Sequence, residues 1–143
     1  MREILFRAKS REDGEWVYGD YFTAKDYLSG KRLHFIATKE CEAFPRGEFT
    51  DAVEIDPETL GQYTGLTDKN GVKIFEDDII KHYNNTAHPE NYATYHVKWY
   101  AEKAKFVVVV IGKRERYEMR KGLKYEVIGN IHDNPEVLKG GAE

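Results

Sequence analysis

Short runs with the two-residue alternation of a β-strand recur along this chain, and a helical period persists nowhere. Residues 95–100 read YHVKWY, in which large apolar side chains alternate with polar ones, as in a half-buried strand. Residues 106–112, FVVVVIG, are rich in β-branched side chains, which favour a buried strand. The strand-like runs follow one another at roughly 8–12 residues, a spacing typical of β-barrels and sandwiches. The sequence therefore predicts a mainly β protein with only short helical turns.

The first half of the chain reads as hairpins. Residues 4–8 alternate, the polar run SREDGE follows, and WVYGDYF at 16–22 supplies a second strand, so the pair predicts a hairpin. Further strands are expected at 33–38 and 53–55, with a loop at 39–52. In DPETLG, residues 56–61, Asp56 is placed to cap and Pro57 to begin one helical turn that Gly61 ends.

Length and composition indicate one globular domain. The chain has 143 residues, 41% of them hydrophobic and 33% charged, which is enough to bury a core. The single cysteine, Cys41, excludes an intramolecular disulfide and fits a reducing cytoplasm. The N-terminal residues MREILFRAKSRED do not resemble a secretory signal, and the longest apolar run, 106–111, is too short to cross a bilayer. We therefore expect a cytoplasmic protein that does not interact with membranes.

The stretch GQYTGLTDKNGVKIFEDDI, residues 61–79, is the part of the chain that most resembles a functional sequence motif. As a calcium loop aligned on Gly71 it fails, because its first ligand position falls on Leu66, which has no side-chain oxygen. As a phosphate loop it fails, because no Lys-Ser/Thr pair follows the last glycine. Asp68, Asn70 and Gly71 instead fit a turn between two strands, with Asp68 bonding backbone amides and Gly71 at positive φ.

Other candidate chemistry is weaker. The carboxylates Glu76-Asp77-Asp78 could form a metal or acid–base site, but neighbours in a strand point to opposite faces, and a solvated turn is the preferred interpretation. The histidines at 82, 88 and 96 match no zinc spacing. No catalytic triad or nucleophile motif is present. We therefore predict no catalytic residues, no metal and no cofactor, and an enzyme is the less favoured class.

Basic residues are concentrated near the C-terminus. Residues 97–124 hold nine basic and three acidic residues, a net charge of +6, so the rest of the chain carries −9 of the total of −3. Within residues 112–125 Tyr117 and Tyr125 are interspersed with six or more cations, a composition that suits single-stranded nucleic acid. A solvated, internally paired face remains the alternative. The predicted binding residues for an anionic partner are Lys113, Arg114, Arg116, Tyr117, Arg120, Lys121 and Lys124.

Residues 56–81, DPETLGQYTGLTDKNGVKIFEDDIIK, resemble the central motif of the YopX family of bacteriophage and prophage proteins. The N-terminal hairpin of that family is similar to ILFRAKSREDGEWVYGDYF, and its C-terminal segment is similar to YEVIGNIHDNPEVL. The resemblance covers nearly the whole chain. One departure is Asp77, which stands where the family usually has glycine; aspartate tolerates positive φ better than most residues.

The resemblance implies a mainly β fold in which N-terminal hairpins (1–60) pack on a small SH3-like barrel (61–139), followed by a frayed tail (140–143) within one domain of 1–143. It implies an accessory protein made inside a bacterial host. Together with the residues, it makes a non-enzymatic binding module for a host or phage macromolecule the leading hypothesis. Direct nucleic-acid binding through 112–125 is the alternative, a protein partner is favoured, and a homo-oligomer is possible.

Overall fold

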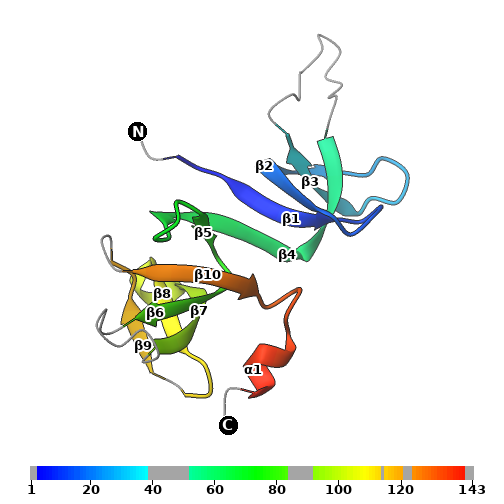
Figure 1. Cartoon of the computed structure of the whole chain (residues 1–143). Coiled ribbons are helices and arrows are strands. Elements are labelled where there is room, and N and C mark those ends of the chain that lie inside the picture. Colours follow the sequence, from blue (N-terminus) through cyan, green and yellow to red (C-terminus); the bar gives the residue numbers. More distant parts are fainter. Residues whose placement is uncertain (1–2, 39–51, 84–91, 114, 121–123, 141–143) are drawn as a thin grey trace. The chain divides into compact units, whose positions relative to one another are not determined.

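The computed structural model describes residues 3–38, 52–83, 92–113, 115–120 and 124–140 (Figure 1). Within those ranges it contains ten strands, one 3₁₀-helix and one short α-helix. The strands are β1 (Phe6–Ser10), β2 (Trp16–Lys25), β3 (Arg32–Ala37), β4 (Ala52–Thr67), β5 (Lys73–Phe75), β6 (Asp78–Tyr83), β7 (Tyr92–Tyr100), β8 (Lys105–Val110), β9 (Arg116–Glu118) and β10 (Tyr125–Asn130). The helices are η1 (Ala101–Lys103) and α1 (Glu136–Gly140). The prediction of a mainly β protein is confirmed.

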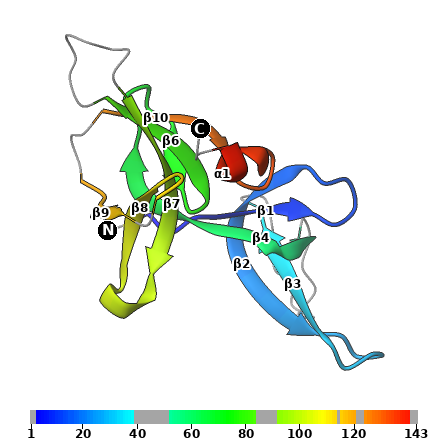
Figure 2. The ribbon, with the colours of Figure 1, turned by 90° about the horizontal axis from the view of Figure 1, so that it is seen from below.

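Contacts divide the chain into two compact units, Met1–Tyr63 and Thr64–Glu143. In the first unit four strands close on themselves: β1 pairs with β2, β2 with β3, β3 with β4, and β4 returns to β1, all antiparallel. Figure 2 shows the long β2–β3 hairpin beside β1. Ala8, Ile36 and Ile55 are fully buried at the centre of this small barrel.

A small barrel was predicted for residues 61–139, and the structure places the closed ring of strand pairs in the N-terminal unit instead. The reason is the length of β4. Its 16 residues let it pair with β3 near Val53 and with β1 as far as Gln62. Both edges of β1 are thereby used, and the hairpins predicted from residues 4–38 become a closed barrel.

Residues 56–61 were predicted as a helical turn, and this is wrong: they lie inside β4. The turn chemistry is present, because Asp56 Oδ1 accepts the Glu58 N–H (3.1 Å) and the Thr59 hydroxyl donates to the Asp56 carbonyl (2.7 Å). However, Thr59 Oγ1 also accepts the Lys9 N–H of β1 (2.8 Å). The pairing register shifts at this point, so these residues form a bulge in the strand.

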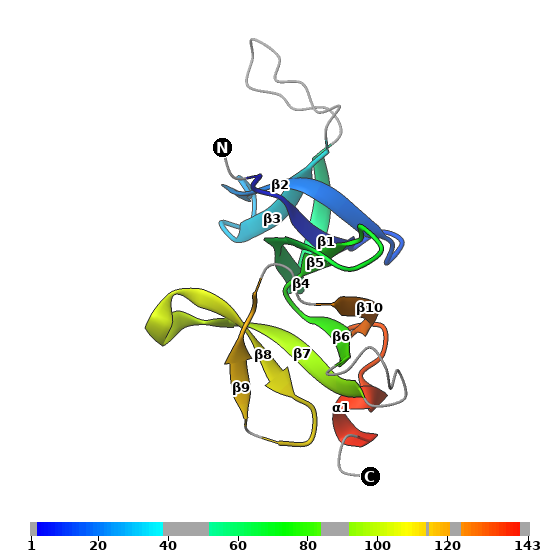
Figure 3. The same ribbon diagram turned by 60° about the vertical axis from the view of Figure 1, so that its left-hand side comes forward.

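The second unit contains a five-stranded antiparallel sheet in the order β10-β6-β7-β8-β9. Figure 3 shows β9 at the edge of this sheet, beside β8. The end of β4 and the short β5 form a hairpin joined to the sheet at β10. One face of the sheet carries the core, a buried cluster made of Ile74, Ile80, Tyr95, Val97, Val108 and Tyr125.

Within the described part of the chain, the structure has no helix of the length and hydropathy needed to cross a membrane. The predicted loop at 39–52, apart from Ala52, lies outside the described residues, as do Cys41, His88 and the last three residues of the predicted tail.

Candidate functional site

The basic segment predicted to bind an anionic partner contains the edge strand β9. In the register with β8, Tyr117 is opposite Val108 and Arg116 is opposite Val109. Val108 belongs to the core cluster, so Tyr117 shares the core face of the sheet, and Arg116 lies on the other side, here called the outer face. The predicted binding residues are therefore divided between the two faces of one sheet.

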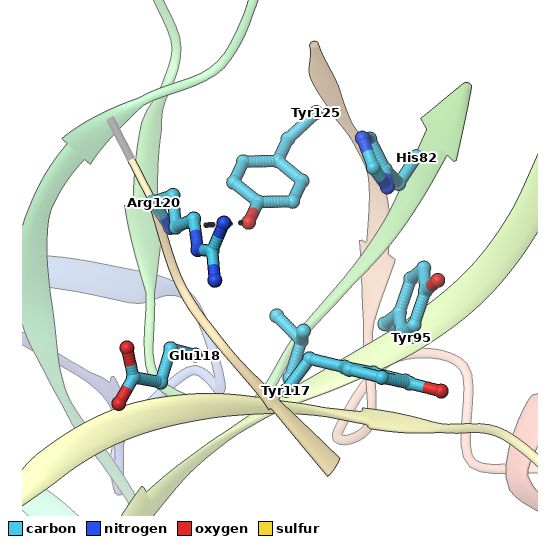
Figure 4. A pocket seen from close by; sticks show the side chains of 7 residues that line it. His82, Tyr95, Tyr117, Glu118, Arg120 and Tyr125 are labelled. Atoms are coloured by element: carbon cyan, nitrogen blue, oxygen red, sulfur yellow. Dashed lines mark hydrogen bonds between the residues drawn. The ribbon is translucent and has the colours of Figure 1, made fainter. Parts of the chain in front are cut away.

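On the core side lies a cleft of about 520 Å³, here called the tyrosine pocket (Figure 4). Side chains from five successive strands of the sheet, and one residue after β9, line it. They are His82, Tyr95, Val108, Tyr117, Glu118, Arg120 and Tyr125.

Four aromatic rings form most of the pocket wall. His82 is tilted against Tyr125 and Tyr95, with ring centroids 5.4 and 6.3 Å apart. Tyr117 meets Tyr95 edge to face at 6.4 Å. Tyr125 and Tyr95 are 2% and 8% exposed and fixed by the core, whereas Tyr117 is 52% exposed. The pocket thus has rigid aromatic walls and one ring accessible to a ligand.

Polar groups lie at the mouth of the pocket. The Arg120 backbone N–H donates to the Tyr125 hydroxyl (3.3 Å), and Figure 4 shows the Arg120 guanidinium directed toward the space between Tyr125 and Tyr117. The Glu118 carboxylate forms an ion pair with Lys105 of the neighbouring strand. Arg120 therefore supplies a positive charge, while the charge of Glu118 is balanced by its partner.

The pocket walls are uncharged at neutral pH. Burial lowers the pKa of His82, which favours its neutral imidazole. Burial also raises the pKa of Tyr95 and Tyr125. The hydrogen bond from the Tyr117 hydroxyl to Glu115 (3.0 Å) raises the pKa of Tyr117. All three phenols therefore keep their protons at neutral pH.

On the outer side, a groove of about 330 Å³ crosses β7, β8 and the start of β9. It is here called the cationic groove, and the described residues of its lining comprise three cations, two aromatic rings and two valines. The hydroxyl of one of the rings, Tyr100, donates to the Glu102 carboxylate (2.9 Å). The lining residues are Lys98, Trp99, Tyr100, Val107, Val109, Lys113 and Arg116. The Arg116 guanidinium carbon lies 4.4 Å from the centre of the Tyr100 ring, a cation–π contact. Trp99 is 46% exposed.

The seven predicted binding residues lie in different places in the structure. Lys113 and Arg116 line the cationic groove, and Tyr117 and Arg120 line the tyrosine pocket. Lys124 is exposed and lines neither. Arg114 and Lys121 lie outside the described residues.

Sequence reasoning missed the contribution of β7, which supplies Lys98, Trp99 and Tyr100 to the groove and Tyr95 to the pocket. The available signal was the alternation of residues 95–100, which separates Lys98 and Tyr100 from Tyr95. Trp99 has the parity of Tyr95, so the alternation does not predict its place in the groove. The register of β7 with β8 brings these β7 residues close to β9, and no sequence pattern predicted that register.

Asp68, Asn70 and Gly71 lie in the turn between β4 and β5. Asp68 Oδ1 accepts the N–H groups of Asn70 (2.8 Å) and Val72 (2.9 Å), and Gly71 has φ of +82°. Asp68 is only 7% exposed, and its Oδ2 accepts the Val127 N–H of β10 (3.0 Å). The Asp68 carboxylate therefore shapes the turn and attaches it to the sheet.

Asp77 forms a partly buried polar cluster with two histidines. Its Oδ2 lies 3.0 Å from His132 Nε2 and its Oδ1 lies 3.5 Å from His96 Nε2. Burial opposes ionisation of Asp77, but the hydrogen bonds and charges of His96 and His132 outweigh it and lower the pKa of the carboxyl group. Among the described residues, no group of three or more His, Cys, Asp or Glu side chains could hold a metal ion.

Comparison with known proteins gives two findings. A family model described as "YopX protein" matches residues 5–139. The crystal structure of protein EF1440 from Enterococcus faecalis is similar, with 25% sequence identity and a TM-score of 0.51, over 96% of this chain and 99% of that chain. No curated protein matches the sequence significantly. Since the family model covers both units described above, the chain belongs to the YopX family.

Proposed function

We propose that this protein is a non-enzymatic binding module for a macromolecule of a phage or its bacterial host, and that the cationic groove is its contact surface. The observation that carries the proposal is the lining of the groove, in which Lys98, Lys113 and Arg116 converge beside two aromatic rings. Such a surface attracts an anionic partner through charge and offers ring surfaces for specific contact. The phage setting and a cytoplasmic location follow from what the family implies.

The proposal is supported by the contrast between the groove and the rest of the molecule. The whole chain carries a net charge of −3, so a polyanion is repelled on average. Three cations on one face, one of them held over the Tyr100 ring, create a local positive site on an acidic protein. We expect this site to orient the partner during association.

Charge reversal of the groove tests this proposal. The Lys98→Glu/Arg116→Glu variant changes the charge by −4 within the groove, and Lys25→Glu/Lys31→Glu makes the same change at the β2–β3 hairpin of the first unit. We expect affinity capture from phage-infected cells, with both protein and nucleic acid analysed, to recover a stoichiometric partner with the wild-type and hairpin-variant baits only. Recovery of the same partner with the groove variant would contradict the groove as contact surface.

A second, narrower candidate is that the partner is single-stranded nucleic acid. The observation in its favour is the placement of Trp99 and Tyr100 among the groove cations, because bases stack on exposed rings while cations follow the phosphates. We expect labelled single-stranded oligonucleotides to bind at low salt, and binding to weaken by about tenfold or more in Lys98→Glu/Arg116→Glu. If neither single- nor double-stranded oligonucleotides bind at low ionic strength, this second candidate is wrong.

A further inference from the structure

The tyrosine pocket lies on the opposite side of the sheet from the cationic groove, and the proposed function does not use it. Its volume of about 520 Å³ falls within the range of roughly 300–1,000 Å³ typical of small-ligand sites. Its seven lining residues come from five paired strands and the segment that follows β9. A ligand bound there would contact a preformed wall.

The walls suit a flat, aromatic ligand. The ring of His82 contacts those of Tyr95 and Tyr125, which are both buried. The fourth, Tyr117, stands at 86° to Tyr95 and has half of its surface exposed. A planar ring can therefore lie on the face of Tyr117 while its edge points toward the rings of Tyr95 and His82, an arrangement that aromatic groups favour. An aliphatic ligand would gain less from these surfaces.

The polar groups suit an anion attached to that ring. The Arg120 guanidinium points toward the space between Tyr125 and Tyr117 (Figure 4). The carboxylate in the lining, Glu118, pairs with Lys105 and interacts more weakly with the charge of Arg120. A guanidinium binds phosphate oxygens with two parallel hydrogen bonds, so Arg120 fits a phosphate better than a neutral substituent. The phenol and imidazole groups of the wall add hydrogen-bonding partners of the kind that read the edge of a heterocycle.

We propose that the tyrosine pocket binds a nucleoside monophosphate group, with its base stacked on Tyr117 against the wall of Tyr95 and His82 and its phosphate bound by Arg120. The group is either a free nucleotide or one nucleotide of a strand. The site is separate from the cationic groove, since their linings share no residue.

The test is an NMR titration of the ¹⁵N-labelled protein with AMP, adenosine and inorganic phosphate, each alone. We expect AMP to shift the amides of β9, β10 and the end of β6, adenosine to shift them with weaker affinity, and phosphate to leave them unchanged. Tyr117→Ala removes the stacking surface, so AMP affinity should fall by about tenfold or more. Tyr117→Phe keeps the ring and should retain binding. Arg120→Gln should weaken AMP toward the affinity of adenosine and leave adenosine unaffected.

Two controls separate the pocket from the groove and from misfolding. Arg116→Gln lies one residue from Tyr117 but on the outer face, and should leave AMP affinity unchanged. The amide spectrum of each variant should remain that of the folded protein outside β9, because Tyr117 and Arg120 are exposed. A trinucleotide that binds more tightly than AMP identifies a strand as the source, and equal affinity identifies the free nucleotide; both support the site.

The proposal is overturned if AMP at millimolar concentration leaves the pocket amides unshifted, or if inorganic phosphate binds as well as AMP. It is also overturned if Tyr117→Ala binds AMP with wild-type affinity. The proposed function is tested separately. It fails if partner capture or oligonucleotide binding is unchanged in Lys98→Glu/Arg116→Glu, and the AMP titration does not bear on that result.

Discussion

At the scale of single residues, Asp77 shows how one side chain can offset a strained backbone. Its φ of +73° lies in the left-handed region, where most residues other than glycine are disfavoured. The backbone is fixed on both sides, because the Asp77 N–H donates to Val97 O (2.9 Å) and its carbonyl accepts the Ile131 N–H (3.0 Å). The carboxylate contacts His96 and His132, so the side chain stabilises a conformation that the backbone alone would resist.

Substitutions at Asp77 separate these two effects. Asp77→Gly removes the histidine interactions but adopts positive φ freely, whereas Asp77→Ala removes the same interactions and keeps the strain of about 1–2 kcal/mol. We therefore expect Asp77→Ala to lower the free energy of unfolding by about 1 kcal/mol more than Asp77→Gly, measured by urea denaturation. Equal losses would show that backbone strain at this position is unimportant.

The lowered pKa of Asp77 predicts a pH dependence. Its carboxyl pKa is below the ordinary value of 3.8 in the folded chain, so the unfolded state binds the proton more readily. The stabilisation is complete above that ordinary value and is lost as pH falls through the lower, folded pKa. We expect the stability difference between wild type and Asp77→Asn to be larger at about pH 6 than at about pH 2.5. A difference independent of pH would contradict the ionised carboxylate in the cluster.

Asp68 is the second residue that single substitutions can test. Its carboxylate accepts three backbone N–H groups, two within the turn and one from Val127. Because Asp68→Ala leaves these donors without that acceptor in a mostly buried place, we expect it to cost about 2–4 kcal/mol in unfolding free energy. Asp68→Asn retains one acceptor oxygen and should cost less. A loss below about 1 kcal/mol for Asp68→Ala would show that water replaces the carboxylate.

At the scale of elements, the β2–β3 hairpin depends on a close approach at Gly19. A Cβ atom there would lie 2.0 Å from the Ala37 carbonyl oxygen, on the backbone of the facing strand. Gly19→Ala therefore requires the two strands to separate, and we expect a loss of about 2 kcal/mol or more. Gly14 is the matched control: it has φ of +72° but open space around it, so Gly14→Ala should cost only about 1 kcal/mol. Thermal unfolding of both variants measures the difference.

The same elements show what local sequence could and could not reveal. The turn at Asp68 was predictable because its chemistry is confined to five adjacent residues. The attachment of Asp68 to Val127, 59 residues away, was not. The motif Asp56-Pro57-Glu58-Thr59 is compatible with both a helix start and a strand bulge. The hydrogen bond from the Lys9 N–H to Thr59 Oγ1 favours the bulge. Local propensity was therefore informative up to the point where a distant strand supplied a competing partner.

The candidate site was likewise predictable only as far as local sequence determines it. Tyrosine and cation richness in residues 112–125 indicated the right region of the chain. It could not indicate that Arg116 and Tyr117 point to opposite faces, because the strand β9 was not predicted. The partners from β6, β7 and β10 enter through strand pairing alone. Composition thus located the binding chemistry, and strand register divided it into a groove and a pocket.

At the scale of the whole molecule, the structure shows which elements carry the uneven charge of the sequence. Half of the net +6 of residues 97–124 belongs to residues 97–118, which run from β7 to the end of β9, and the other half belongs to residues 119–124, which follow β9. Part of that charge is internally balanced, as in the Lys105–Glu118 ion pair. Among the described residues, the lining that contains the three cations of the groove includes no carboxylate. The central claim is that these three cations bind an anionic macromolecule.

The salt dependence of binding to a single-stranded oligonucleotide tests that claim most directly. Each phosphate that a protein cation neutralises releases counterions and adds about −0.7 to the slope of log K against log salt concentration. Three groove cations therefore predict a slope near −2 for the wild type, falling toward about −0.7 in Lys98→Gln/Arg116→Gln. The hairpin variant Lys25→Gln/Lys31→Gln should keep the wild-type slope. Equal slopes for the wild type and the groove variant, or no binding by the wild type, would contradict the groove as a polyanion site.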